Sequence, residues 1–246
     1  MHPDDEWPLT SDMTLIEVIR TAPQATAIFE DLRIDYACAG ATTLKSVAAN
    51  VGLTPNELMS MIEIEPRVSS SVWNDGSLSG LTIFLVSDHK YIQAELFPRI
   101  RLGIDATIAR LGPLPLLRRM HELELTLAET VFEHATSEEQ DLFPIVDNLE
   151  AAAASVAVKP PKARISARVL REVIEHEIIR DRVRDLRDLA GELPLDDGIA
   201  LLRLDLRTFQ RHLHEHMHLE NNVLYPRAIA IENALRHASD RQRIYV

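Results

Sequence analysis

The sequence predicts an all-α fold, in which an up-down-up-down four-helix bundle follows a small helical domain. The chain contains only eight glycines, and most of it is rich in Leu, Ala, Glu, Arg and Ile at helical spacing. Alternating Val, Ile and Thr, the usual sign of a strand, are sparse. With 246 residues, 46% of them apolar, the chain is long enough for one ordinary domain and a small companion.

Residues 1–66 predict the small domain, because short helical segments alternate there with turn-forming residues. The last of these segments has a clear start signal. Thr54 is the expected N-cap, with Pro55 at the first helical position and Glu57 at the third. The stretch from Pro66 to Ser77 has the Pro, Ser and Gly composition of a linker, so we expect a linker over residues 67–78.

Residues 79–246 predict the bundle, because four longer segments each carry an apolar stripe. The segments are 79–102, 114–149, 166–190 and 196–234. The connections 103–115 and 191–197 are compact, while the middle one, 151–164, is longer and contains two adjacent prolines. Short connections favour antiparallel neighbours, which gives the up-down-up-down order.

The charge and the composition exclude several classes of function. There are 26 Lys and Arg against 38 Asp and Glu, and the net charge of −12 would repel nucleic-acid phosphates and anionic lipid. No run approaches the roughly 20 apolar residues of a transmembrane helix, and residues 1–6 are acidic where a secretory signal would be basic. We therefore expect a cytoplasmic protein with no nucleic-acid or membrane partner. A single cysteine, Cys38, cannot form an internal disulfide or a thiolate zinc site, so any metal must be held mainly by His and carboxylate.

A repeated histidine–glutamate pattern marks the second and fourth bundle segments. His134-x3-Glu138-x3-Leu-Phe-Pro returns as His216-x3-Glu220-x3-Leu-Tyr-Pro with identical spacing. Residues four apart are offset by about 40° on a helix, so each His and its Glu project from one face. The first and third segments add one histidine each, and the expected metal ligands are His89, His134, Glu138, His176, His216 and Glu220.

This donor set is too large for one tetrahedral zinc but suits two first-row metals, for which iron is the natural choice. If Glu138 and Glu220 both bridge, each metal has two imidazoles and two carboxylate oxygens, with positions left for a bridging oxygen and a small molecule. Two Fe(II) with two carboxylates sum to +2, as do two Fe(III) with an added oxo bridge, so a two-electron change leaves no new charge in the core. The alternative for a single histidine is an ordinary core or surface residue, and the repeat argues against it.

The remaining polar residues are assigned by helical phase. The side chains that we expect to surround the ligands are His212, Glu172 and Asp141. For the two acids, an exposed helix charge is an equally good interpretation. His214 and His218 lie about 200° from His216 around the helix, so they should face outward. We expect the Leu-aromatic-Pro tails to pack and then stop or kink the helix, with no catalytic role.

These motifs resemble those of a known family, the di-iron proteins that repair iron centres, over most of the chain. The bundle blocks that carry the resemblance are Ser87-Asp88-His89, His134 to Pro144, Glu175-His176 and, most specifically, His216 to Arg227. In the small domain, residues 34–40 resemble the short cysteine motif of the family. The family usually has two adjacent cysteines there, whereas this chain has Ala37 and then Cys38.

The resemblance implies a hemerythrin-like bundle that holds two non-haem iron ions, bridged by oxo and by two Glu and bound by four His. It implies repair of iron–sulfur clusters after nitrosative or oxidative stress, with reduction of nitric oxide to nitrous oxide or supply of iron. The expected partners are NO or O2, damaged iron–sulfur proteins and an external electron donor. Enzymatic turnover stays open, because an O2- or NO-binding sensor, or an iron-storage module, would use the same ligands.

Cys38 is a separate candidate, as a redox thiol. Without a neighbouring cysteine it cannot form a vicinal disulfide, but nitrosation and a mixed or intersubunit disulfide are open to it. The alternative is a small buried apolar residue. Residues 1–65 carry three basic and 11 acidic side chains, a net charge of −8, so protein docking or homodimer formation suits this domain better than DNA binding.

Overall fold

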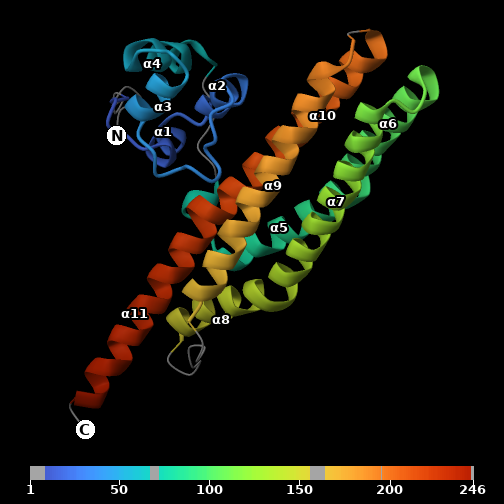
Figure 1. The fold of residues 1–246 in the computed structure, drawn as a ribbon. Coiled ribbons are helices and arrows are strands. Elements are labelled where there is room, and N and C mark those ends of the chain that lie inside the picture. Colours follow the sequence, from blue (N-terminus) through green and yellow to red (C-terminus); the bar gives the residue numbers. More distant parts are fainter. Residues whose placement is uncertain (1–8, 67–71, 156–163, 195, 245–246) are drawn as a thin grey trace. The chain divides into compact units, whose positions relative to one another are not determined.

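The computed structural model describes residues 9–66, 72–155, 164–194 and 196–244, and over these residues the all-α prediction is confirmed (Figure 1). The chain divides into two compact units, Met1–Gly76 with Met217–Val223 and Ser77–His216 with Leu224–Val246. Residues 67–71 of the expected linker and 156–163 of the long connection lie outside the described residues. No helix in the described ranges is both long and apolar enough to cross a membrane.

The first unit contains four short helices around a small apolar core. They are α1 (Leu15–Thr21), α2 (Ala25–Asp31), α3 (Leu44–Asn50) and α4 (Pro55–Ile64). Capping boxes begin α1 and α4, because Thr14 and Thr54 each exchange hydrogen bonds with the Glu three residues later. The predicted N-cap at Thr54, with Pro55 at the first helical position, is confirmed. The core includes Leu15, Phe29, Tyr36, Leu44 and Leu58.

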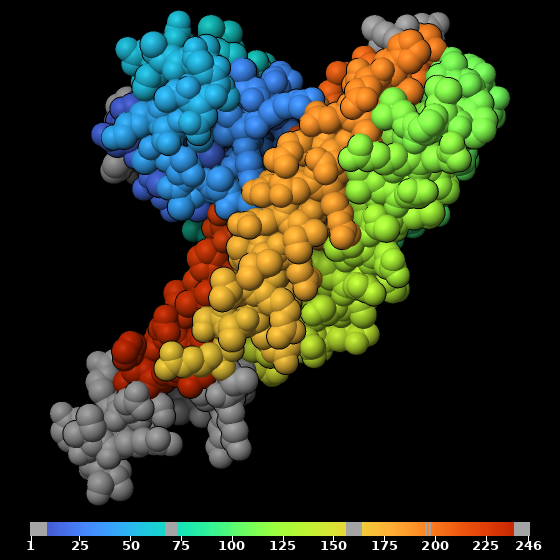
Figure 2. All heavy atoms as spheres, in the orientation of Figure 1, coloured from blue at the N-terminus to red at the C-terminus, as the bar shows by residue number. Residues whose placement is uncertain are grey.

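Over the described residues the bundle consists of four helical segments, three of which contain a π-helical turn, and a 3-10 turn, η1 (Val72–Asn74), precedes them. The bundle makes up the second unit except for Met217–Val223 of the fourth segment, which belong to the first unit. The segments are α5 (Leu78–Tyr91), η2 (Ile92–Leu96) and α6 (Phe97–Leu111); α7 (Pro115–Ser137), η3 (Glu138–Leu142) and α8 (Phe143–Ala154); α9 (Ser166–Glu192); and α10 (Asp197–His218), η4 (Leu219–Leu224) and α11 (Tyr225–Ile244). Figure 2 shows α9 packed along α7, two helices that are in extensive contact.

Side-chain contacts show that successive segments are antiparallel. Thr82 on α5 donates a hydrogen bond to Asp147 on α8, while His89, farther along α5, contacts Glu139, which comes earlier in its own segment. The residue numbers thus rise along one segment as they fall along the other. Contacts between the second and third segments and between the third and fourth follow the same rule. The bundle therefore has the up-down-up-down order that short connections favour.

Each π-helical turn ends at an aromatic residue that is followed by proline. The three pairs are Phe97-Pro98, Phe143-Pro144 and Tyr225-Pro226. Proline has no N–H to donate and clashes with the preceding turn, and one extra residue in that turn relieves the clash. In η3, for example, the Phe143 N–H donates to the carbonyl of Glu138, five residues earlier. The helix therefore does not stop after this motif but continues beyond a wider turn, and in Figure 1 α8 turns away from the line of α7, as the expected kink requires.

The first bundle segment is longer than predicted, because α6 runs through Gly103 to Leu111. We expected Gly103 to begin a connection. A Cβ at this position would lie 3.0 Å from Leu202 Cδ1, so the glycine permits close approach of α10. The connection to α7 is therefore only the stretch 112–114.

Candidate metal centre

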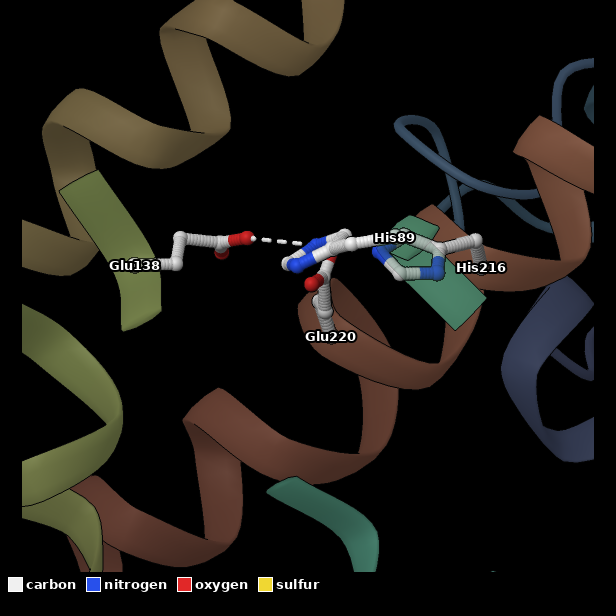
Figure 3. A group of neighbouring side chains, drawn as sticks. All are labelled: His89, Glu138, His216 and Glu220. Atoms are coloured by element: carbon white, nitrogen blue, oxygen red, sulfur yellow. Dashed lines mark ion pairs between the residues drawn. The ribbon is translucent and has the colours of Figure 1, made fainter. Parts of the chain in front are cut away.

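Six buried side chains form two groups that could each hold a metal ion. One group is His89, Glu138, His216 and Glu220, and the other is His134, Glu138, His176 and Glu220. Within each group the ligand atoms lie within 4.8 Å of one another, and both carboxylates belong to both groups. Figure 3 shows the first group, with Glu138 of η3 reaching His89 of α5 opposite Glu220 and His216 of the fourth segment. The structure thus brings together the four residues of the repeat and the two added histidines, His89 and His176.

The distances and the burial suit a bound cation. Glu138 Oε2 lies 3.3 Å from His89 Nε2 and 3.4 Å from His134 Nε2, and His134 Nε2 lies 2.9 Å from His176 Nε2. Glu138 and Glu220 are fully buried. Two ionised carboxylates out of contact with water are costly unless positive charge accompanies them. Imidazole nitrogens and carboxylate oxygens are the donors that first-row transition metals accept, so the residues fit such an ion.

Acidic side chains hold the other ring nitrogen of three of the histidines. The pairs are His89 Nδ1 with Glu139 at 2.9 Å, His134 Nδ1 with Glu175 at 3.0 Å and His216 Nδ1 with Asp88 at 2.6 Å. A carboxylate can only accept, so Nδ1 carries the proton in each pair. The Nε2 lone pair is then directed at the site, which is how proteins orient histidine ligands.

Asp88 serves two histidines, since it also accepts a hydrogen bond from His212 at 2.8 Å. Burial by itself would raise the pKa of Asp88, but the bonds from His212 and His216 hold this pKa far below the usual range. The hydrogen bond from His134 likewise lowers the pKa of Glu175 against the opposing effect of burial. Both acids therefore remain ionised acceptors and keep their histidines in one orientation.

Residues 81–228 match the family model described as the hemerythrin HHE cation binding domain. The chain belongs to this family. The chain is also 28% identical over 215 residues to the iron–sulfur cluster repair protein YtfE of Yersinia pseudotuberculosis serotype IB (strain PB1/+). The matched region covers 84% of this chain and 92% of the relative. The protein of the same name from Yersinia pestis (strain Pestoides F) is 27% identical over the same shares. All six candidate ligands lie within the hemerythrin domain.

Three further side chains were expected around the ligands of the hemerythrin domain. His212 bonds Asp88, and Glu172 Oε2 lies 3.1 Å from His134 Nδ1. The expectation for Asp141 is wrong, because this residue is exposed and pairs with Arg168 at 3.0 Å. We placed it by its seven-residue spacing from His134, which assumes an α-helix throughout. The π-helical turn η3 contains more residues per turn, so this spacing no longer returns to the same face.

Two histidines of the hemerythrin domain that were expected to face outward do not. His214 is only 6% exposed and shares a buried stripe with Gln210 and Met217, at i, i+4 and i+7. His218 is partly buried, with its ring centroid 5.7 Å from that of Tyr36. Burial lowers the pKa of His218 to about 4. The phase argument assumed one narrow buried face for this helix, whereas residues 213, 214, 216 and 217 of α10 are all buried.

Sequence reasoning missed four residues that contact the candidate ligands, namely Asp88, Glu139, Glu175 and Tyr225. Each of the three acids is next to a candidate ligand in the sequence, and each bonds a ligand on a different helix. That adjacency was the available signal. Tyr225 donates a hydrogen bond from its hydroxyl to Glu138 Oε1, although we assigned its motif to packing alone.

Cys38 lies in the first unit, partly buried, in a loop that packs on the segment Met217–Val223. Its backbone N–H donates to Asp35 Oδ1 at 2.9 Å. Asn222 Nδ2 donates to the carbonyls of Tyr36 and Ala37 at 3.1 and 3.2 Å. The Cys38 loop is therefore anchored two residues from Glu220 in the sequence, which gives the thiol a defined place in this unit.

Proposed function

We propose that this protein is a non-haem di-iron protein that repairs iron–sulfur clusters damaged by nitrosative or oxidative stress. One observation carries the metal assignment: Glu138 and Glu220 each belong to both ligand groups. Shared carboxylates suit two neighbouring ions that they bridge, rather than two independent sites. The repair role draws support from the printed names of the relatives, which match 84% of this chain.

Iron suits the donor set better than zinc or magnesium. Each group offers two imidazoles and two carboxylates, which exceeds the four-coordinate demand of zinc once a small molecule also binds. Magnesium prefers a shell made only of oxygen. Imidazole with carboxylate is a common donor set of non-haem iron, and both charged carboxylates favour a pair of divalent ions.

The reaction that we propose is the reductive coupling of two nitric oxide molecules, 2 NO + 2 e⁻ + 2 H⁺ → N2O + H2O. Two ferrous ions would supply the two electrons, and an external donor must restore them. The chain itself orients the ligand imidazoles through Asp88, Glu139 and Glu175. Aromatic rings exclude water, since Phe143 stacks on His89 at 6.0 Å and Tyr225 lies parallel to His176. The six candidate ligands are each at most 5% exposed, so little bulk water reaches them.

Two other roles use the same residues. Supply of iron to a damaged cluster would treat the bound iron as cargo. Reversible binding or sensing of O2 or NO without turnover is the alternative, because it would need the same cation-binding residues.

Metal analysis followed by a turnover assay tests the proposal. Protein reconstituted anaerobically with Fe(II) should hold two iron ions per chain and, with NO and excess reductant, form N2O beyond one equivalent per iron pair. Glu220→Ala should lose the iron pair, while Asp141→Asn, at the exposed acid, should keep it. Reversible uptake of NO or O2 with no N2O would favour the sensor, and iron transfer to an apo cluster protein would favour delivery. Failure to bind iron in the intact protein would refute all three roles.

A further inference from the structure

We propose that Tyr225 is a positioning residue that holds the carboxylate of Glu138 in place between the two ligand groups. The inference rests on the metal pair of the proposed function. Tyr225 is the first residue of α11 and is 1% exposed, and its hydroxyl donates a hydrogen bond to Glu138 Oε1. Glu138 Oε2 faces both groups, 3.3 Å from His89 Nε2 and 3.4 Å from His134 Nε2. The phenol bond to Oε1 therefore fixes the plane of the Glu138 carboxylate, and with it the direction of Oε2.

The π-helical turn explains why Tyr225 reaches the site. Glu220 and Tyr225 are five residues apart, and on an α-helix this spacing would offset them by about 140°. Bonds of the π-helix join residues i and i+5, so η4 brings both side chains to the same buried side. Pro226 favours this turn, because it cannot donate to the preceding one. The ring is then held parallel to His176, with an interplanar angle of 7° and centroids 6.2 Å apart.

The second copy of the motif provides an internal comparison. Phe143 follows Glu138 by five residues, as Tyr225 follows Glu220. Phe143 lies parallel to His89, also with an angle of 7° and with centroids 6.0 Å apart. The two aromatic residues thus pack alike, and they differ by one hydroxyl group. That hydroxyl breaks the two-fold repeat of the site and gives Glu138 a hydrogen-bond donor that a phenylalanine cannot supply to Glu220.

Tyr225→Phe is the direct test, because it removes the hydroxyl and keeps the stacked ring. The matched control is Tyr91→Phe, at a tyrosine that is 47% exposed. The loss of iron to an excess of Fe(II) chelator should be 10- to 100-fold faster in Tyr225→Phe than in the wild type, which is the range for residues that orient metal ligands. In infrared difference spectra between the wild type and Tyr225→Phe, the carboxylate stretches of Glu138 should shift, because Oε1 loses its hydrogen bond and the carboxylate can turn. Tyr91→Phe should match the wild type in both measurements.

Several results would overturn the inference. Unchanged iron loss together with unchanged carboxylate stretches would show that the hydroxyl does not position Glu138. A tyrosinate-to-Fe(III) charge-transfer band that disappears in Tyr225→Phe would make Tyr225 a ligand instead. The infrared test can be repeated with Zn(II), which has no redox chemistry. If Tyr225→Phe shifts the carboxylate stretches of the Zn(II)-loaded protein, but the iron-loaded wild type does not react with NO, the proposed reaction would be refuted and the positioning role would stand.

Discussion

Replacement of Asp88 by Asn should weaken metal binding about 10- to 100-fold. Asp88 accepts hydrogen bonds from His216 Nδ1 at 2.6 Å and from His212 Nε2 at 2.8 Å, one on each carboxylate oxygen. Asn has the same shape but only one accepting oxygen, so it cannot serve both imidazoles in these tautomers. A lost charge-assisted hydrogen bond costs about 1.5–3 kcal/mol. At about 1.4 kcal/mol per tenfold change, this equals the 10- to 100-fold effect known for residues that hold metal-binding histidines.

Anaerobic competition with a calibrated Fe(II) chelator would measure this change. Asp141→Asn is the control, because it makes the same chemical change at an exposed acid whose ion pair with Arg168 should contribute less than about 1 kcal/mol. Asp88→Asn should release iron at a correspondingly lower chelator concentration, and Asp141→Asn should follow the wild type. An Asp88→Asn variant within twofold of the wild type would show that Asp88 does not orient a ligand. Equal losses in both variants would point to general electrostatics instead.

Three other changes should have measurable effects. Glu150→Gln removes a carboxylate that accepts bonds from the first two backbone N–H groups of α5; it should lower the free energy of unfolding by about 1–2 kcal/mol in denaturant titrations. These bonds lower the Glu150 pKa against burial, so in the wild type this contribution is complete above the unfolded-state pKa and disappears as the pH falls through the folded-state pKa. Gly40→Ala would place a Cβ 2.6 Å from Asn222 Oδ1 and should cost about 1–3 kcal/mol, whereas Gly191→Ala, with open space, should be neutral or stabilising. Chelation of the metal should lower the melting temperature of the wild type, and Glu220→Ala should remove that dependence on metal. A wild-type melting temperature that does not change on addition of the chelator would contradict this.

The candidate ligands were predictable from sequence because their signal is local. A His and a Glu four residues apart share a helix face whatever the tertiary structure, and two copies of the spacing specify two such faces. The partners of the ligands depend on which helices meet. Glu175 is next to His176 in the sequence, yet it bonds His134 on α7, and no spacing within one helix contains that fact. The sequence places the acidic residue Glu175 beside a candidate ligand, but only the packing of the bundle shows which histidine it bonds.

The phase error at Asp141 has its source in the proline of the repeated motif. Proline removes a donor, the preceding turn takes on an extra residue, and positions beyond it rotate relative to an α-helix. This rotation moves Asp141 away from the ligands and brings Phe143 against His89. A proline that looks like a helix terminator is therefore part of how the chain builds the site. The ligand motif and its aromatic-proline tail should be considered as one unit. The proline of the tail sets where the aromatic side chain points, and so brings Phe143 against His89 and Tyr225 against His176.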